Sequence, residues 1–394
     1  MLGTLVIQKK SRRLIALSTT ALALPGIAPF IAVADSPPTQ STISYKFSNY
    51  QEDALSRSEV LFGDLDRYDI DIHQFQLITP IGDNWSLSVD ANQESMSGAS
   101  PWFTTASNDG SPIINLSGAS GISDTRSELA VGGRYYLASG SIAANIGYSE
   151  ENDYRAKYVG FDGQKTFNND MTTLGLGFSY SSDDIFPTDA VKFNRIMNAE
   201  KNSKSMVFSV SQIINQTSTF QSALSITEQS GFLSDPYKLL DVRPEEKTQI
   251  AWSNAYRHFI KAADAALHIN YRYYRDDFGI DSHTLDFAWH QNINRYFQLI
   301  PKLRYYSQSA ADFYTNIDDF SKGLSEYQSS DYRLSSFGAV SGGLSGVINL
   351  GDWSITIAAE RYIANEKYAS FQVQQVPAGL VKYSRLSVGI DYTF

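Results

Sequence analysis

The 394-residue sequence contains no cysteine. Disulfides, thiolate zinc sites, cysteine-ligated iron–sulfur clusters and cysteine nucleophiles are therefore excluded. Charged residues are also few, at 19%, and the 42 acidic residues outnumber the 32 basic ones, which gives a formal net charge of −10. Because no basic patch offsets this acidic balance, nucleic acid is not expected as a partner.

Long hydrophobic runs are also missing beyond residue 34, where no stretch of eighteen apolar residues occurs. An apolar stripe with helical spacing is absent as well. Aromatic side chains, in contrast, are abundant, at 13% of residues with 24 Tyr and 22 Phe. The chain is therefore too aromatic for a disordered protein and too polar for a helical membrane protein.

The first 34 residues have the three parts of a secretory signal peptide. A basic head is followed by an apolar stretch over residues 14–33, and residues 32–34 read Ala-Val-Ala; the head consists of Lys9, Lys10, Arg12 and Arg13. A transmembrane anchor is the alternative, but Pro25 and Pro29 interrupt the apolar stretch. We therefore expect residues 1–34 to be cleaved and residues 35–394 to be exported.

Apolar and polar residues alternate with a period of two in many segments of the exported chain. Residues 85–91 (WSLSVDA) are one example, and residues 386–394 (LSVGIDYTF) are the last. Each segment has about ten residues, which is the length that a tilted strand needs to cross a bilayer. A soluble β-sandwich also alternates in this way, so the period alone does not decide the fold class.

The connections between these segments favour a membrane barrel, because short turns alternate with longer loops. The short turns lie at residues 81–83, 138–140, 168–170, 215–217, 261–264, 292–294 and 351–352. The longer loops lie near residues 52–65, 95–125, 183–202, 229–247, 308–329 and 365–381, and two further loops, near 151–153 and 275–280, are short. Short periplasmic turns with long extracellular loops are typical of outer-membrane barrels.

We therefore predict an all-β fold, a transmembrane antiparallel up-and-down β-barrel of about 16 strands (14–18). Closure is required because every backbone N–H and C=O in hydrocarbon must find a partner, and an open sheet leaves edges unpaired. Too few residues precede the first strand for a plug, so residues 35–394 are expected to form one barrel with no separate plug domain.

The last eight residues, SVGIDYTF, resemble the β-signal that the bacterial barrel-assembly machinery reads. The assembly-signal positions are Gly389, Tyr392 and Phe394, and the two aromatic residues share the parity of the apolar residues before them. The resemblance predicts a protein of the Gram-negative bacterial outer membrane. The expected partners are the barrel-assembly machinery, periplasmic chaperones, outer-membrane lipids and lipopolysaccharide.

Four further strings look like a known family. They are SGASP at residues 97–101, DPYK at 235–238, RP at 243–244 and YRYYRDDFGIDSHT at 271–284. Together they resemble the domain-of-unknown-function family 3570, whose members are uncharacterised Gram-negative outer-membrane β-barrel proteins. The resemblance implies a location and an architecture over almost the whole exported chain, and it implies no substrate.

A barrel of this width encloses an aqueous lumen unless loops fill it. Inward parity on three consecutive predicted strands selects six residues, which are His268, Arg272, Asp286, His290, Lys302 and Arg304. Tyr306, Glu360, Arg385 and Asp391 share this parity on nearby strands. One interpretation is a wall that attracts anionic solutes, and the other is a lattice of salt bridges that braces the barrel.

The loop string at residues 275–283 also suggests a cation site, because carboxylates and an imidazole can ligate a divalent metal. The weak candidates are Asp276, Asp277, Asp281 and His283. The calcium-loop spacing is missing, and Asp and Gly are ordinary turn residues, so we assign no metal and no cofactor. The long loop at 95–125 is expected to constrict the lumen, to cap its mouth or to lie on the surface.

Three functions remain open at this point. The leading hypothesis is a porin-like channel for the transport of small solutes, in which lumen charges set the preference. The alternative is a closed barrel that acts as a scaffold or sleeve for an envelope partner, such as a redox or surface protein. The third is a barrel hydrolase at Asp281 and His283; no G-x-S-x-G motif supports it, so an enzyme is not expected.

Overall fold

The computed structural model of the chain describes residues 36–63, 65–98, 100–117 and 123–394. The predicted signal peptide at residues 1–34 lies outside the described residues. The strands are β1 (Thr42–Glu52), β2 (Val60–Phe62), β3 (Asp69–Ile81), β4 (Trp85–Ser97), β5 (Ser100–Ala106), β6 (Pro112–Ser117), β7 (Ser123–Leu137), β8 (Gly140–Glu150), β9 (Tyr154–Phe167), β10 (Thr172–Ile185), β11 (Ala199–Asn215), β12 (Ser218–Gly231), β13 (Glu246–Ile260), β14 (Ala265–Asp276), β15 (Asp281–Asn292), β16 (Phe297–Gln308), β17 (Phe337–Leu350), β18 (Trp353–Asn365) and β19 (Lys382–Thr393).

The helical elements within the described residues are four single turns of 3-10 helix. They are η1 (Arg57–Glu59), η2 (Lys261–Ala263), η3 (Tyr332–Leu334) and η4 (Glu366–Tyr368). No helix in this part of the chain is both long and apolar enough to cross a membrane.

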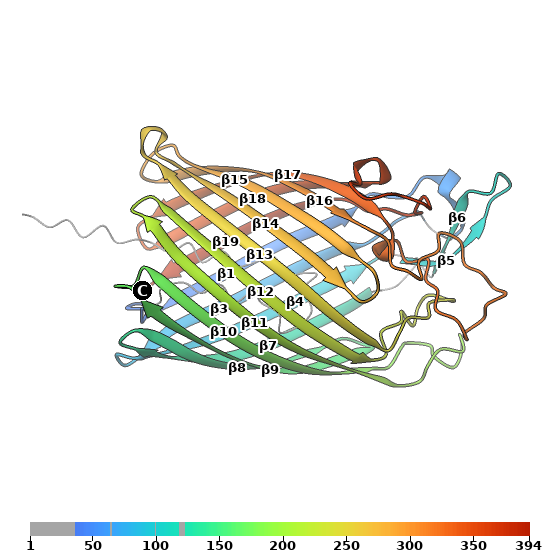
Figure 1. The fold of residues 1–394 in the computed structure, drawn as a ribbon, viewed down its shortest axis with the longest axis horizontal. Coiled ribbons are helices and arrows are strands. Elements are labelled where there is room, and N and C mark those ends of the chain that lie inside the picture. Colours follow the sequence, from blue (N-terminus) through green and yellow to red (C-terminus); the bar gives the residue numbers. More distant parts are fainter. Residues whose placement is uncertain (1–35, 64, 99, 118–122) are drawn as a thin grey trace, which may run out of the picture.

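Sixteen of the strands form one closed antiparallel barrel (Figure 1). Its order is β1-β19-β18-β17-β16-β15-β14-β13-β12-β11-β10-β9-β8-β7-β4-β3, and β3 pairs with β1 to complete the ring. Thr42 of β1 faces Thr393 of β19, so the first and last strands close the sheet. The prediction of an all-β barrel of about sixteen strands is confirmed.

The two ends of the barrel differ, as the alternation of connections predicted. Figure 1 shows short turns and the C-terminus at one end, which we call the short-turn end. The opposite, long-loop end carries the long connections. The short turn at residues 168–170 has left-handed φ angles of 54°, 54° and 64°, which the sequence Asn-Asn-Asp tolerates better than most.

The predicted alternation separates the two faces of the barrel wall. Phe178 pairs with Phe161 and Met206 on the outer face, where all three side chains are exposed. The next residue, Ser179, faces inward between Gly160 and Ser205. Apolar side chains on the outside and small polar ones inside are the pattern of a barrel that faces lipid and encloses water.

The long loop predicted at residues 95–125 contains regular structure. Its described part forms the hairpin of β5 and β6, which joins β2 in a three-stranded sheet. This sheet projects beyond the barrel strands at the long-loop end (Figure 1). A small core of Leu55, Val60, Ile114 and Leu116 holds it. These strands are too short for their alternation to be recognised in the sequence.

Candidate solute pathway

One side of the lumen, which we call the basic wall, is formed by inward side chains of β1 and β13–β19. The strand register places on this face all six lumen residues singled out from the sequence, and also Lys46, Arg257, Glu360 and Arg385. The same register also turns Lys247, Glu52, Asp276 and Asp391 inward, so the wall has seven cationic side chains and five carboxylates, besides its two histidines. The alternation of the sequence predicts that most of these residues face inward. It does not predict which strands pair with each other to close the barrel next to them.

Two carboxylates near the middle of the basic wall, Asp286 and Glu360, each contact one arginine. Asp286 Oδ1 lies 3.4 Å from Arg304 Nε, and the two residues face each other across β15 and β16. Glu360 accepts a hydrogen bond from Arg385 on the neighbouring strand. Two carboxylates are thus already engaged with two guanidinium groups.

Other cations of this wall have different contacts. Arg257 Nη1 donates to the backbone oxygens of Tyr256 (3.0 Å) and Ile269 (3.3 Å). Arg272 lies over the ring of Tyr274 at 5.4 Å. Lys302 is exposed, and its electrostatic neighbours are Glu360, Arg385 and Asp286. Positive charge on this wall therefore exceeds the carboxylate charge that could neutralise it.

The two lumen histidines lie together on the same wall. The ring centroids of His268 and His290 are 3.9 Å apart, with the rings tilted by 35°. Nδ1 of His290 is 3.5 Å from Oε1 of Gln298. Arg257 and Lys302 are electrostatic neighbours of both rings. Since two cationic side chains lie nearby, this histidine pair is a poor site for a metal ion.

The opposite side of the lumen, which we call the acidic wall, is formed by β3, β4 and β7–β11. Its carboxylates are Asp90, Glu94, Glu128, Asp162 and Asp183, and its cations are Arg126, Arg134 and Lys201. Every cation of this wall is in a salt bridge: Arg126 with Glu128 (3.1 Å), Arg134 with Asp162 (2.9 Å) and Lys201 with Asp183 (3.0 Å).

The two walls therefore create an electric field across the lumen. Cations are in excess on the basic wall and carboxylates are in excess on the acidic wall. Charges that line a pore influence whether anions or cations enter it. Their effect is strong because the low-dielectric protein wall screens the lining charges poorly. Pairing braces the acidic wall, whereas Lys302 and Arg272 of the basic wall are exposed and have no salt bridge to the described residues.

The connection from β16 to β17, residues 309–336, crosses the long-loop end and contacts loops from several sides of the ring. Thr104 N of the β5–β6 hairpin donates to Asp318 Oδ2 (2.7 Å). Gln328 exchanges backbone hydrogen bonds of 2.8 and 3.0 Å with Val242. Asn316 N donates to Gln375 Oε1 (2.7 Å). We call residues 232–245, 309–336 and 369–381 the loop layer.

Charged groups hold the loop layer together. Asp331 is buried and accepts hydrogen bonds from Arg243 Nη2 (2.8 Å) and Arg333 Nε (2.8 Å). Arg243 also contacts Asp241 at 2.7 Å. Burial alone would raise the pKa of Asp331, but Arg333 and Arg243 outweigh it and hold this pKa well below its usual value. Asp331 is therefore an anion at any physiological pH.

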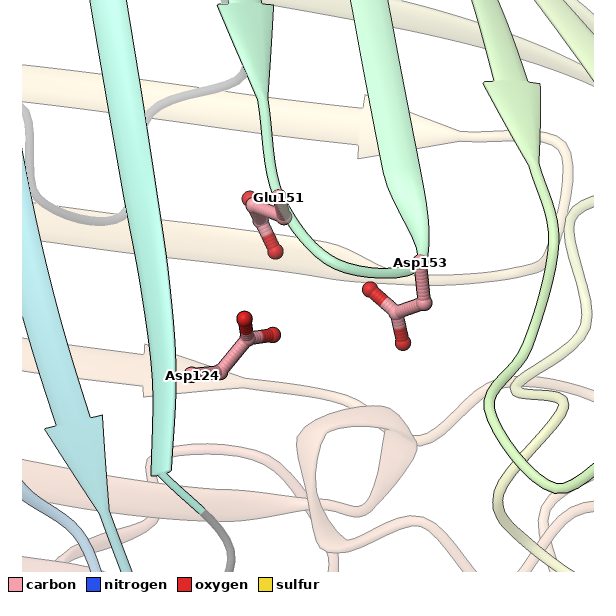
Figure 2. Close-up of side chains that lie close together, drawn as sticks. All are labelled: Asp124, Glu151 and Asp153. Carbon is pink, nitrogen blue, oxygen red and sulfur yellow. The ribbon is translucent and has the colours of Figure 1, made fainter.

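A second charged group lies at the entrance to the acidic wall, where Asp124, Glu151 and Asp153 approach one another (Figure 2). Each carboxylate has a partner of its own. Asp124 accepts from Asn152 Nδ2 (2.7 Å), Asp153 accepts from the hydroxyl of Tyr237, and Glu151 lies 3.7 Å from Arg126. Partly buried acidic groups that each have such a partner do not by themselves identify a metal site.

Glu151 is the member of this group whose ionisation is most perturbed. Burial raises its pKa to about 7, although Arg126 opposes the shift, and nearby Asp153 and Asp124 add to it. The sequence analysis did not identify Glu151 as a candidate. No sequence motif includes it, and it lies beside Asp124 only because their strands pair.

The weak metal candidates from the sequence lie in separate contacts. Asp276 pairs with Lys247 at 2.9 Å, and Asp277 Oδ2 accepts from Thr248 N at 2.9 Å. Asp281 accepts from the hydroxyl of Tyr273 at 2.5 Å, whereas His283 Nδ1 is 2.8 Å from the hydroxyl of Tyr271. In the described part of the chain these four residues do not form a group with metal-ligand spacing.

The residues of the predicted assembly signal lie at the short-turn end of β19. Tyr392 stacks on Trp353, with ring centroids 4.4 Å apart, and Phe394 lies 5.5 Å from Tyr392. Phe394 also exchanges two backbone hydrogen bonds of 2.9 Å with Ser41. The last residue of the chain is thus part of the seam that closes the barrel. Gly389 faces Lys46 across the same seam.

Comparisons with solved structures report the same kind of fold. A bacterial polysaccharide outer membrane secretin superposes with a TM-score of 0.51 at 11% identity, over 90% of this chain and 97% of that chain. A ferric enterobactin receptor of Pseudomonas aeruginosa gives 0.44 at 11% identity, over 91% of this chain and 60% of the receptor. A siderophore receptor of Acinetobacter baumannii gives 0.45 at 9% identity, over 89% and 58%. At 11% identity the likeness to the secretin concerns the fold alone.

Comparison of the sequence itself identifies the family. No curated protein matches the chain. The model of a family described as "Protein of unknown function (DUF3570)" matches residues 14–380, which is most of the chain. The protein therefore belongs to the DUF3570 family.

Proposed function

We propose that this protein is an outer-membrane channel for small solutes that prefers anions. One observation carries the proposal: the basic wall exposes Lys302 and Arg272 to the lumen with no salt bridge to the described residues, whereas each cation of the acidic wall is in a salt bridge. A solute anion exchanges part of its hydration shell for contacts with these side chains. It dissociates again because these contacts do not surround it on all sides.

The location belongs to the same proposal. The signal-like residues 1–34 would direct export, and the C-terminal residues Gly389, Tyr392 and Phe394 would direct insertion by the barrel-assembly machinery. The apolar outer face would then contact outer-membrane lipids, with the long-loop end outside the cell and the short-turn end in the periplasm. The loop layer would narrow the entrance on the outer side.

A planar-bilayer measurement of the refolded protein tests the channel. We expect a steady conductance and a reversal potential in a KCl gradient that reports preference for Cl⁻. Replacing Lys302→Glu changes the charge of the basic wall by two units and is expected to lower the anion preference. Lys192→Glu is the matched control, because this lysine is exposed in the loop between β10 and β11 and carries the same charge change.

The two variants also define what would contradict the proposal. A folded wild-type barrel without conductance at any voltage would exclude an open channel. Equal shifts in Lys302→Glu and Lys192→Glu would mean that net charge, and not the basic wall, determines the preference.

The second candidate is a closed barrel that serves as a scaffold or sleeve for an envelope partner. The loop layer favours it, because residues 309–336 contact loops on several sides of the long-loop end. Crosslinking in cells is the test. Recovery of assembly factors and lipopolysaccharide without an envelope protein would count against the scaffold.

The hydrolase candidate is the weakest of the three. Asp281 and His283 each bind a different tyrosine, Tyr273 and Tyr271, and no hydrogen bond joins the pair among the described residues. The two residues therefore make separate structural contacts. They are not arranged as a general base that would activate a water molecule or a hydroxyl group.

A further inference from the structure

We propose that the outer face of the barrel has a binding site for one phospholipid, with an acyl chain in a groove over β7–β10 and the phosphate beside Lys165. The groove has a volume of about 760 Å³ and lies toward the short-turn end. It is separate from the lumen and from the loop layer. The proposal therefore does not depend on the solute that the lumen takes.

Missing side chains create the floor of the groove. Gly133, Ala144 and Gly163 lie on three consecutive strands, with Gly133 opposite Ala144 and Gly163 opposite Ile142. A Cβ at Gly133 would meet nothing within 4 Å, and one at Gly163 would meet Ile142 at an ordinary 3.7 Å. Neither glycine is required by crowding, so the depression exists because the sequence places no side chain there.

Aromatic side chains form the walls of the groove. Trp85 packs against Tyr135 on one side, with ring centroids 4.8 Å apart and the rings tilted by 46°. Phe161, Phe178 and Phe208 stand exposed on the other side. The hydrophobic effect does not favour one lipid in this groove over the bulk bilayer, because lipid tails are as apolar as these residues. Close van der Waals contact in a groove that fits one chain does retain it.

A cation marks the headgroup end of the groove. Lys165 lines the groove, is exposed and lies just before the turn at residues 168–171. Its Nζ donates to the hydroxyl of Ser139 (2.5 Å), and it has no salt bridge to the described residues. A lysine at the membrane interface attracts lipid phosphate. An apolar groove that ends at a cation matches a phospholipid better than it matches a second copy of this chain.

The test is native mass spectrometry of the intact barrel released from detergent with phosphatidylglycerol, with diacylglycerol as the phosphate-free probe. We expect the wild type to retain one phosphatidylglycerol and to retain diacylglycerol about fivefold more weakly. Gly133→Phe fills the floor and is expected to abolish retention. Lys165→Gln is expected to weaken it about fivefold, the factor for one lysine–lipid charge contact.

Two control variants separate the site from general effects on the barrel. Gly342 of β17 lies on the outer face elsewhere, and a Cβ there also meets nothing within 4 Å, so Gly342→Phe should retain the lipid. Lys261→Gln removes a cation from another turn at the same end and should retain it as well. Circular dichroism and thermal unfolding establish that each variant is folded.

Three results would overturn the proposal. One is equal lipid retention by all variants, and another is equal retention of diacylglycerol and phosphatidylglycerol by the wild type. The third is a change of oligomeric mass in Gly133→Phe with lipid retention unchanged, which would make the groove a contact between copies of the chain.

Discussion

At the scale of single residues, Glu151 makes the behaviour of the lumen entrance depend on pH. Burial raises the pKa of this carboxyl to about 7, so it gains a proton as the pH falls from 8 to 6. Loss of its negative charge leaves Arg126, 3.7 Å away, less neutralised. We therefore expect the anion preference of the channel to rise as pH falls, with a midpoint near 7, and reversal potentials measured across this range test it.

Substitution of the same residue checks this assignment. Glu151→Gln should remove the pH dependence and keep the preference of the low-pH form. Glu150→Gln is the matched control, because Glu150 is exposed and pairs with Arg155 at 2.8 Å. If the dependence survived in Glu151→Gln, another group would be responsible.

The sign for stability is opposite to that of a salt-bridged acid: a raised pKa means that stability falls as pH rises from about 4.5 to about 7.

At the scale of elements, the loop layer depends on the buried carboxylate of Asp331. Asp331→Asn leaves Arg243 and Arg333 without their shared anion, and removal of one partner of a buried ion pair costs about 3 kcal/mol. We expect residues 309–336 to exchange their amide hydrogens faster while the barrel strands keep their protection. Hydrogen-exchange mass spectrometry measures both regions in one experiment.

The same loop provides the control. Asp319→Asn makes the identical change at an exposed residue whose carboxylate binds the backbone and hydroxyl of Ser321. It should leave the exchange of residues 309–336 almost unchanged. Equal effects of the two substitutions would show that the buried charges do not hold the loop layer together.

At the scale of the whole molecule, the loop layer and the basic wall have separable effects. Thr315 N donates to Ser329 O at 3.0 Å, so the ends of the segment between them are close. Replacing residues 316–328 by a short glycine–serine linker should enlarge the conductance, because the entrance widens. Anion preference should stay as in the wild type, because the basic wall is intact. Single-channel recording in a KCl gradient measures both quantities.

The outcome of this replacement also bears on the two leading functions. An unchanged conductance would show that the loop layer does not limit ion flow. A change of anion preference without a change of conductance would place the selectivity in the loop layer and would contradict the role proposed for Lys302 and its neighbours.

Much of the fold is readable from local patterns in the sequence. The turn residues at 82–83, 168–170 and 351–352 mark strand ends, because Gly, Asn and Asp accept the backbone angles that tight turns need. Parity then assigns Lys302 and Arg304 to the same face of one strand. The hairpin of β5 and β6 could not be read in this way, since both strands are short and β6 pairs with β2 across a long sequence separation.

The sequence by itself determined a barrel of about sixteen strands, the inward and outward faces, the two unlike ends and the family. All of these depend on neighbours in the chain, where a period of two and turn chemistry act directly. Tertiary structure alone decided which charges are neutralised, how residues 309–336 cross the long-loop end, and that Gly133 and Gly163 form one groove. Those features depend on strand register and ring closure, which bring residues far apart in the chain within contact distance.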